Sequence, residues 1–249
     1  MFSLLGHFGR ALLDFALPPH CLVCREPLAA ASEYLCPQCW APIRAVRPAR
    51  CPRCSCPNAE RGCANCAAWE LERVLVLGDH AGPLREAIHR FKFEGQRQLG
   101  EPLGWCLGQA PEFAAALREV DLLIPVPLHA ARQRERGYNQ SEELARGLSG
   151  VLGAPLCTDH LRRRRATRQQ ASLDAAGRHE NLAGAFEVCG VLPAHTCIGL
   201  VDDVVTTAST LSACAQALQQ AGARRIWGLA LACPFLKPPL GTRPFLDAS

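Results

Sequence analysis

The 249-residue sequence lacks the features that would place it in a membrane or in the secretory pathway. No apolar run approaches the roughly 18 residues that cross a bilayer. The longest run, from Ile226 to Cys233, is interrupted only by Gly228 and is far too short. The apolar start of the chain is no typical secretory leader either, because Arg10 and Asp14 interrupt it and no basic segment or small-residue cleavage site flanks it. We therefore expect a cytoplasmic protein without a membrane span, whose N-terminal segment forms an amphipathic helix.

Glycine-rich nucleotide-binding motifs are absent, and lysine is scarce. Neither G-x-G-x-x-G nor G-x4-G-K-[ST] occurs, which argues against a dinucleotide fingerprint and a P-loop. Of 27 basic residues, 25 are arginine, and only Lys92 and Lys237 are lysine. Arginine suits bidentate phosphate binding, although codon usage in a GC-rich genome would give the same bias. Position says more: between His129 and Arg168 nine arginines stand against four acids, so we expect an anionic ligand there.

Cysteine, in contrast, is abundant and unevenly placed. Nine of the 15 cysteines fall in residues 21–66, which predicts a small N-terminal module, residues 1–70, and a larger domain, residues 71–249. Eight of them form four Cys-x2-Cys pairs: Cys21 and Cys24, Cys36 and Cys39, Cys51 and Cys54, Cys63 and Cys66. This spacing suits tetrahedral zinc, whereas disulfides would need an oxidising compartment. We expect one or two structural zinc ions that supply folding energy, with the pairs combined sequentially or in a cross-braced order.

After the cysteines, apolar runs alternate with helical patterns. We expect strands within residues 71–80, 121–128, 197–201 and 225–233, and helices at residues 82–93, 141–152 and 210–222. Ser141 is the expected N-cap of the second helix, and Gly222 is expected to close the third. This alternation is typical of the α/β class, with a mostly parallel sheet that has helices on both faces. Ligands of such sheets bind beyond the carboxyl ends of the strands.

The stretch VDDVVTTAST, residues 201–210, lies at such an end. The apolar run delivers Asp202 and Asp203 to its tip, and a hydroxyl-rich turn leads directly into a helix. The N–H groups of a helix N-terminus bind phosphate, and adjacent carboxylates accept hydrogen bonds from vicinal hydroxyls. Alternatively, the hydroxyls only cap the helix and the acids are surface charges, yet paired acids beside a buried strand are costly without a partner. The pattern favours a sugar phosphate as ligand.

VDDVVTTAST resembles the loop with which type I phosphoribosyltransferases hold phosphoribosyl pyrophosphate (PRPP). Three further blocks narrow the resemblance to the ComF family: the Cys-x2-Cys pairs, IPVPLHAARQRERGYNQSEELAR at residues 124–146, and LRRRRATRQQASLDAAGRHENLAGAF at residues 161–186. The resemblance implies a type I phosphoribosyltransferase-like fold that binds PRPP with Mg²⁺, and a hood over the acceptor formed by the zinc module and the chain to about residue 100. It also implies a role in natural competence, DNA uptake or the use of external DNA. Single-stranded DNA and proteins of the uptake machinery are then possible partners.

The resemblance also implies roles for particular residues. Asp202 and Asp203 would be catalytic and hold the ribose, arginines would bind the diphosphate, and Lys92 would approach phosphate or simply lie along its helix. The PRPP-binding set is then Asp202, Asp203, Val204, Val205, Thr206, Thr207, Ala208, Ser209, Thr210, Arg132, Arg134, Arg136 and Lys92. Residues 161–186 would form a mobile flap that includes Arg163, Arg165, Thr167, Gln170, Arg178 and Asn181. The alternatives are a solvated basic loop at the first arginines and an exposed basic helix in place of the flap.

One departure concerns Ala208, because the family usually has glycine at this position. Alanine lacks the freedom of glycine at positive φ, so we expect a slightly reshaped loop. The chain would be a phosphoribosyltransferase of unknown acceptor, or a PRPP binder that has lost catalysis. A function of a different class is a non-catalytic nucleic-acid or protein-binding adaptor that uses the zinc module and the arginine-rich segment.

Overall fold

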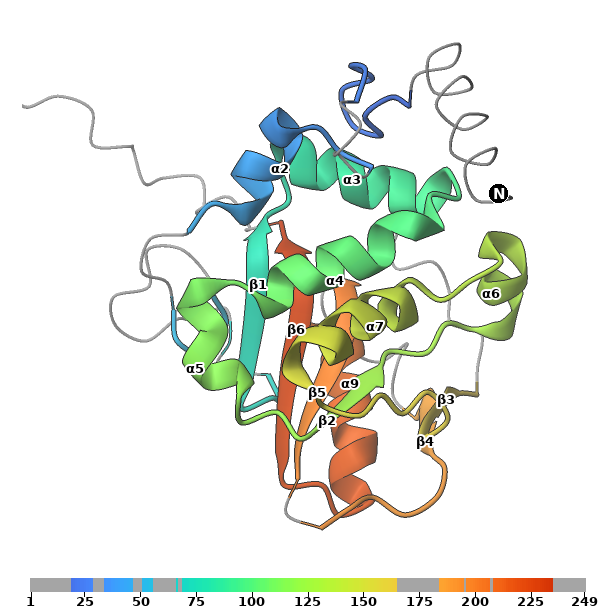
Figure 1. Ribbon diagram of the computed structural model, residues 1–249. Helices are drawn as coiled ribbons and strands as arrows, with labels where there is room; N and C mark the ends of the chain where they lie inside the picture. The colour runs from blue at the N-terminus through green and yellow to red at the C-terminus, as the bar shows by residue number, and fades with distance from the viewer. Residues whose placement is uncertain are drawn as a thin grey trace, which may run out of the picture.

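A four-stranded parallel sheet with strand order β1-β6-β5-β2 forms the centre of the molecule (Figure 1). The computed structural model describes residues 19–28, 34–46, 51–55, 66, 69–164, 184–194, 196–206 and 208–234. The strands of the sheet are β1 (Arg73–Asp79), β2 (Leu122–Pro125), β5 (Cys197–Val204) and β6 (Arg225–Cys233). The α/β class and the parallel sheet are therefore confirmed. The third predicted strand is longer than expected, because β5 continues through Asp202 and Asp203 to Val204.

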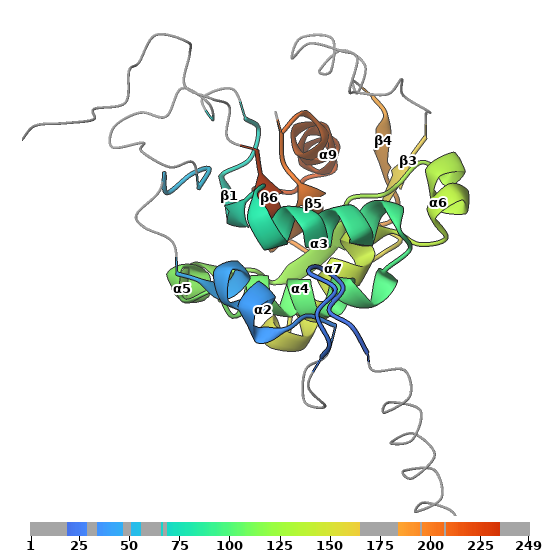
Figure 2. The ribbon, with the colours of Figure 1, turned by 90° about the horizontal axis from the view of Figure 1, so that it is seen from above.

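Helices cover both faces of this sheet. The helices of this part of the chain are α3 (Gly82–Phe93), α4 (Gly100–Gly108), α5 (Ala114–Leu117), α6 (Ala130–Arg136), which has no buried residue, α7 (Gln140–Leu152) and α9 (Ser209–Gln220), with short 3-10 turns η2 (Arg97–Leu99) and η3 (Pro111–Phe113). Figure 2 shows α9 on one side of the sheet and α4 and α7 on the other. A separate antiparallel pair consists of β3 (Leu161–Arg163) and β4 (Phe186–Val188).

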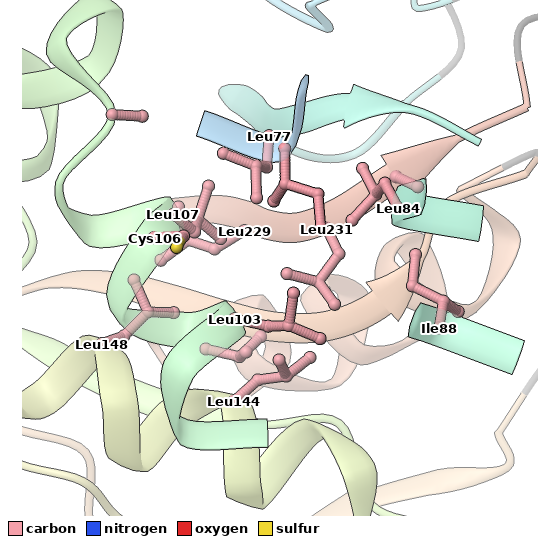
Figure 3. Close-up of a cluster of buried hydrophobic side chains, with 14 of the residues drawn as sticks. Leu77, Leu84, Ile88, Leu103, Cys106, Leu107, Leu144, Leu148, Leu229 and Leu231 are labelled. Atoms are coloured by element: carbon pink, nitrogen blue, oxygen red, sulfur yellow. The ribbon is translucent and has the colours of Figure 1, made fainter. Parts of the chain in front are cut away.

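Side chains that alternate along each strand build two hydrophobic cores. In β6, Leu229 and Leu231 lie in the core beneath α4 and α7 (Figure 3), whereas Ile226 and Ala230 lie in the core beneath α9. Because successive strand residues point to opposite faces, a strand buried on both faces reads as a continuous apolar run. This explains why residues 225–233 were recognisable from the sequence alone.

The ends of two helices are fixed by local chemistry. The prediction that Ser141 caps α7 is wrong, because the cap is Asn139, whose side chain accepts a hydrogen bond from the Ser141 N–H at 3.1 Å. Gly222 does end the last helix, with φ at +100°. The N–H of Ala223 then reaches back to the carbonyl of Leu218 at 2.9 Å, which is the hydrogen bond of a Schellman motif.

The N-terminal module shares its packing with the α/β domain. Helix α2 (Pro37–Arg44) contributes Trp40 and Ile43 to the core that also holds α3 and α4. β1 is an edge strand, and residues 53–55 cover it: the Ser55 hydroxyl donates to the Val74 carbonyl at 2.9 Å and accepts from the Val76 N–H at 3.3 Å. Covered edges cannot pair with other chains. The division of the chain at residue 70 stays a prediction.

Within the described ranges, no helix has both the length and the apolar character needed to cross a membrane. The amphipathic helix predicted at the start of the chain falls in residues 1–18, outside the described residues.

Candidate functional site

Asp202 and Asp203, the acids of the predicted sugar site, lie near the carboxyl end of β5. As neighbouring strand residues, their side chains leave the sheet on opposite faces. Asp203 is buried, and its Oδ1 lies 2.8 Å from the ammonium nitrogen of Lys92 on α3. Asp202 is partly exposed, and its Oδ1 accepts from the Asp203 N–H at 2.9 Å and from the Ser141 hydroxyl at 3.4 Å. The structure therefore brings Lys92 to the acids, as a counter-charge.

The surroundings of Asp202 perturb its carboxyl group. Withdrawal from water raises the pKa of Asp202 to about 7, and repulsion from Asp203 adds to the rise, while Lys92, the Asp203 N–H and Ser141 oppose it. Near neutral pH the carboxyl of Asp202 therefore exists in both protonation states. A strongly perturbed acid at the carboxyl edge of an α/β sheet is typical of a functional site.

The turn after β5 leads into α9, whose N-cap residue is an alanine. The N-cap of α9 is Ala208, which offers no capping hydrogen bond and adopts the left-handed conformation with φ at +55°. The N-cap position itself is thus held by an alanine and not by one of the hydroxyl-bearing residues of the turn. The turn is hollowed by a small open pocket lined by Asp202, Val204, Val205, Thr206, Ala208, Ser209, Thr210 and Leu211. Of the predicted loop residues, Thr207 lies outside the described residues.

Three predicted arginines follow β2 on a helix rather than on a solvated loop. Arg132, Arg134 and Arg136 all belong to α6, whose N-cap is His129. Arg132 and Arg134 are exposed, whereas Arg136 is partly buried and donates through Nη1 to Oε1 of Gln140 at 3.0 Å. Exposed guanidinium groups on a short helix beside a strand end suit an anionic ligand.

Arg163 links the predicted flap to the acids. Burial lowers its pKa; among its neighbours Cys214 and Asp202 raise the pKa and Arg132 lowers it. Arg163 thus lies within electrostatic range of both the acid and the arginine helix. It belongs to β3, and its guanidinium lies 5.5 Å from the centroid of the Phe186 ring on β4. β3 and β4 lie at the two ends of the predicted flap, residues 161–186. The other flap residues, Arg165, Thr167, Gln170, Arg178 and Asn181, lie outside the described residues.

Sequence reasoning missed two contributors to this site. Ser141 was interpreted as a helix cap, which concealed its contact with Asp202. His80, which had no motif partner, follows β1 directly: burial lowers its pKa, Lys92 and Arg85 lower it further, and Asp203 opposes them. Its place at the carboxyl end of a parallel strand was the signal that could have identified it.

Four cysteines form a closed cluster in the N-terminal module. The sulfur atoms of Cys21, Cys24, Cys36 and Cys39 all lie within 4.8 Å of one another, and those of Cys24 and Cys36 are 3.5 Å apart. Zinc–sulfur bonds of about 2.3 Å give tetrahedral edges of roughly 3.8 Å, so the thiols fit a zinc ion. Burial raises the pKa of Cys21, but the N–H groups of Cys24, Cys36 and Val23 outweigh this and bring it to about 6. The thiolate form that zinc requires is thereby favoured at Cys21, whereas burial and the neighbouring thiols raise the pKa of Cys39.

A second group repeats this geometry. Cys51, Cys54 and Cys66 cluster in the same way, with 4.0 Å between the sulfurs of Cys51 and Cys66, while Cys63 lies outside the described residues. In the first Cys-x2-Cys pair of each group, the residue after the second cysteine has a positive φ. These residues are Arg25 and Ser55. The first cysteine pair is thus grouped with the second, and the third pair with Cys66 of the fourth. This is the sequential order and not the cross-braced one.

Known proteins are similar to this chain both in the cysteine-rich module and in the α/β domain. The family described as a double zinc ribbon domain matches residues 12–69. The chain is 34% identical over 222 residues to competence protein F of Haemophilus influenzae, covering 85% of this chain and 96% of that protein. It is 33% identical over 230 residues to the DNA utilization protein YhgH of Escherichia coli K12, covering 86% and 97%. It is 23% identical over 215 residues to competence protein ComFC of Bacillus subtilis, covering 81% and 78%.

These relatives extend over both the cysteine clusters and the parallel sheet. A double zinc ribbon with structural zinc therefore precedes an α/β domain, and the chain belongs to the ComF family.

Proposed function

We propose that this protein binds PRPP with Mg²⁺ and is a phosphoribosyltransferase-like protein. The observation that carries the proposal is the junction of β5 and α9, where Asp202 and Asp203 adjoin a hollowed turn that leads into the N-terminus of a helix. Such a turn supplies N–H groups and positive potential to a phosphate, and the carboxylates supply acceptors for ribose hydroxyls.

The proposed ligand would span three elements. Its 5-phosphate would bind the turn formed by residues 204–210, and its ribose would lie against Asp202 and Asp203. Its diphosphate would face the arginines of α6, with Lys92 between the two groups of charges. Lys92 already bonds to Asp203, so it would share its charge between the acid and the ligand.

Transfer from PRPP breaks the bond between C1 of the ribose and the diphosphate, so positive charge develops on the ring and negative charge on the leaving group. Arginines fixed on α6 would stabilise that negative charge, and the acids would orient the ribose. An acceptor would approach from the side of α3 and the zinc module, which lie above the carboxyl ends of the strands (Figure 1). We assign no acceptor. A PRPP binder without transferase activity would use the same contacts.

We further propose that this binding serves DNA uptake or the use of external DNA in the cytoplasm. This proposal is supported by the names of the related proteins, which refer to competence and to DNA utilization.

Calorimetric titration of the full chain with PRPP and Mg²⁺ tests the proposal. Asp202→Asn and Asp203→Asn should each lower the affinity at least tenfold, because the ribose loses a charged acceptor. The matched control is Asp121→Asn, since Asp121 accepts the Cys197 N–H at the opposite end of β5. That variant should bind PRPP like the wild type. Failure of the wild-type protein to bind PRPP would overturn the proposal. Release of diphosphate in a screen of acceptors would then separate an enzyme from a binder.

A second candidate function, a nucleic-acid adaptor, is favoured by one specific feature. A groove of about 950 Å³ between the zinc module, α4 and α7 is lined by Tyr34, Arg44, Arg97, Gln98, Glu101, Pro102, Trp105, Glu143, Arg146, Gly147 and Gly150. Trp105 is 45% exposed, and the Arg44 guanidinium lies 5.7 Å from its ring centroid. Single-stranded nucleic acids stack on aromatic and guanidinium planes of this kind. The groove is only weakly basic, because Glu143 pairs with both Arg97 and Arg146, so this function ranks second.

The two functions respond differently to salt and to mutation. Fluorescence anisotropy with a labelled oligothymidine would show steep salt dependence for nucleic-acid binding, a loss in Trp105→Ala and no change in Asp203→Asn. PRPP binding should show the opposite sensitivity to the two variants.

A further inference from the structure

Four consecutive side chains at the start of α7 and just before it reach four different elements of the proposed PRPP site. These residues, Tyr138, Asn139, Gln140 and Ser141, are between 1% and 8% exposed. Tyr138 donates its hydroxyl to the carbonyl of Phe91 on α3, the residue before Lys92. Gln140 accepts from Arg136 on the arginine helix at 3.0 Å. The segment is therefore tied to the lysine and to the arginines.

The other two side chains hold the strand ends. Asn139 donates through Nδ2 to the carbonyl of Val126, just beyond β2, at 3.1 Å. Its Oδ1 accepts from the Ser141 N–H, which fixes Ser141 in the first turn of α7. The Ser141 hydroxyl then donates to Oδ1 of Asp202 at 3.4 Å. A chain of hydrogen bonds thus runs from the end of β2 through the helix cap to the acid on β5.

We propose that Ser141 is a positioning residue for Asp202, and that residues 138–141 hold this acid in register with the diphosphate-facing arginines. The inference rests on the proposed PRPP site. A hydroxyl that donates to a carboxylate favours its ionised form and fixes its orientation. The N-terminus of α7 adds positive potential at the same place.

The other titratable groups around Asp202 come from four elements. Asp203 lies beside it on β5, Lys92 approaches from α3, Arg163 from β3 and Cys214 from α9. Replacing Ser141 by alanine changes none of these charges. Its effect on the protonation of Asp202 can therefore be assigned to the lost hydrogen bond.

The test is the pH profile of PRPP affinity, measured by calorimetry with Mg²⁺ from about pH 5.5 to 9. Ribose hydroxyls need the ionised carboxylate as an acceptor, so affinity should fall as the pH drops through the pKa of Asp202. In Ser141→Ala the midpoint should move upward by about one pH unit, because the ionised form has lost a donor. Ser141→Thr, which keeps the hydroxyl, should restore the wild-type midpoint.

Ser149→Ala is the matched control. Ser149 lies on the same helix, but its hydroxyl donates to the Ala154 carbonyl at the far end, so its profile should coincide with that of the wild type. A Ser141→Ala profile that coincides with Ser149→Ala, or a loss of affinity that is equal at every pH, would overturn the positioning role. A wild-type protein that does not bind PRPP would instead overturn the proposed function, which keeps the two failures distinct.

Discussion

The ammonium nitrogen of Lys92 lies 2.8 Å from Oδ1 of Asp203, and the two side chains are only 18% and 13% exposed. This pair joins the C-terminal end of α3 to the carboxyl end of β5. It also holds one of the two lysines of the chain at the proposed ligand site. Largely buried charges depend strongly on their partner, so the pair lends itself to a direct test.

Lys92→Met should lower the free energy of unfolding by about 2 kcal/mol, because Asp203 is left buried without its counter-charge. Urea denaturation measures the loss. The double variant Lys92→Met with Asp203→Asn should lose less than the sum of the single variants. Arg85→Met on the same helix is the control, since Arg85 is exposed. Equal losses for Lys92→Met and Arg85→Met would contradict the pair's role.

Asp202 should make stability depend on pH. Its folded pKa, about 7, lies above the ordinary value of 3.8, so the native state binds a proton that the unfolded state releases. Stability contributed by this proton is full below about pH 4 and is lost as the pH rises to about 7. Asp202→Asn should therefore be more stable than the wild type by up to about 4 kcal/mol at pH 8, with no advantage at pH 4. Urea titrations at both pH values measure the difference; an advantage of the same size at both would refute the assignment.

Cys39→Ser should destabilise the whole chain, because the first zinc cluster is packed through Trp40 and Ile43 into the main core. We expect one zinc ion fewer by native mass spectrometry and a fall in melting temperature of more than about 5 °C. Cys157→Ser controls for the substitution, since Cys157 is a partly exposed cysteine outside both clusters. Unchanged zinc content in Cys39→Ser would show that the cluster does not hold the metal.

The sequence predicted the parts of the molecule that depend on local pattern. Residues 82–93 and 225–233 were recognised with their observed bounds, because each carries a complete helical or strand period between clear end signals. The cysteine pairs were recognisable for a related reason, since ligands two residues apart can reach one ion with little help from the rest of the fold.

Contacts between distant segments could not be predicted in this way. Ser141 looked like a helix cap because Ser is a common cap, and only the three-dimensional register places its hydroxyl beside an acid 61 residues further on. The cover that Ser55 gives to the edge of β1 is another example, because it depends on how the module docks. The position of Lys92 beside Asp203 was left open for the same reason.

On α7, the close packing against α4 requires glycine at position 147 but not at position 150. A Cβ at Gly147 would lie 2.1 Å from the Glu101 carbonyl oxygen and 2.8 Å from the Trp105 backbone nitrogen, whereas a Cβ at Gly150 meets nothing within 4 Å. Gly147→Ala should therefore cost about 2 kcal/mol of unfolding free energy. Gly150→Ala should stabilise the helix by up to about 1 kcal/mol, since alanine is the better helix former. Thermal unfolding compares the two, and a loss in both variants would contradict this packing.

Ala208 holds the left-handed conformation, with φ at +55°, at the turn between β5 and α9. That conformation costs an L-residue about 1 kcal/mol, a cost that glycine does not have. Ala208→Gly should therefore leave the free energy of unfolding near the wild-type value, although its buried methyl group is lost. Ala217→Gly in the middle of α9 has no strain to relieve and should lose about 1 kcal/mol. The same relief should let the turn close on a phosphate, so Ala208→Gly should bind PRPP more tightly than the wild type. Equal destabilisation by both substitutions, measured by urea denaturation, would show that the turn is not strained; unchanged PRPP affinity would show that the strain does not limit binding.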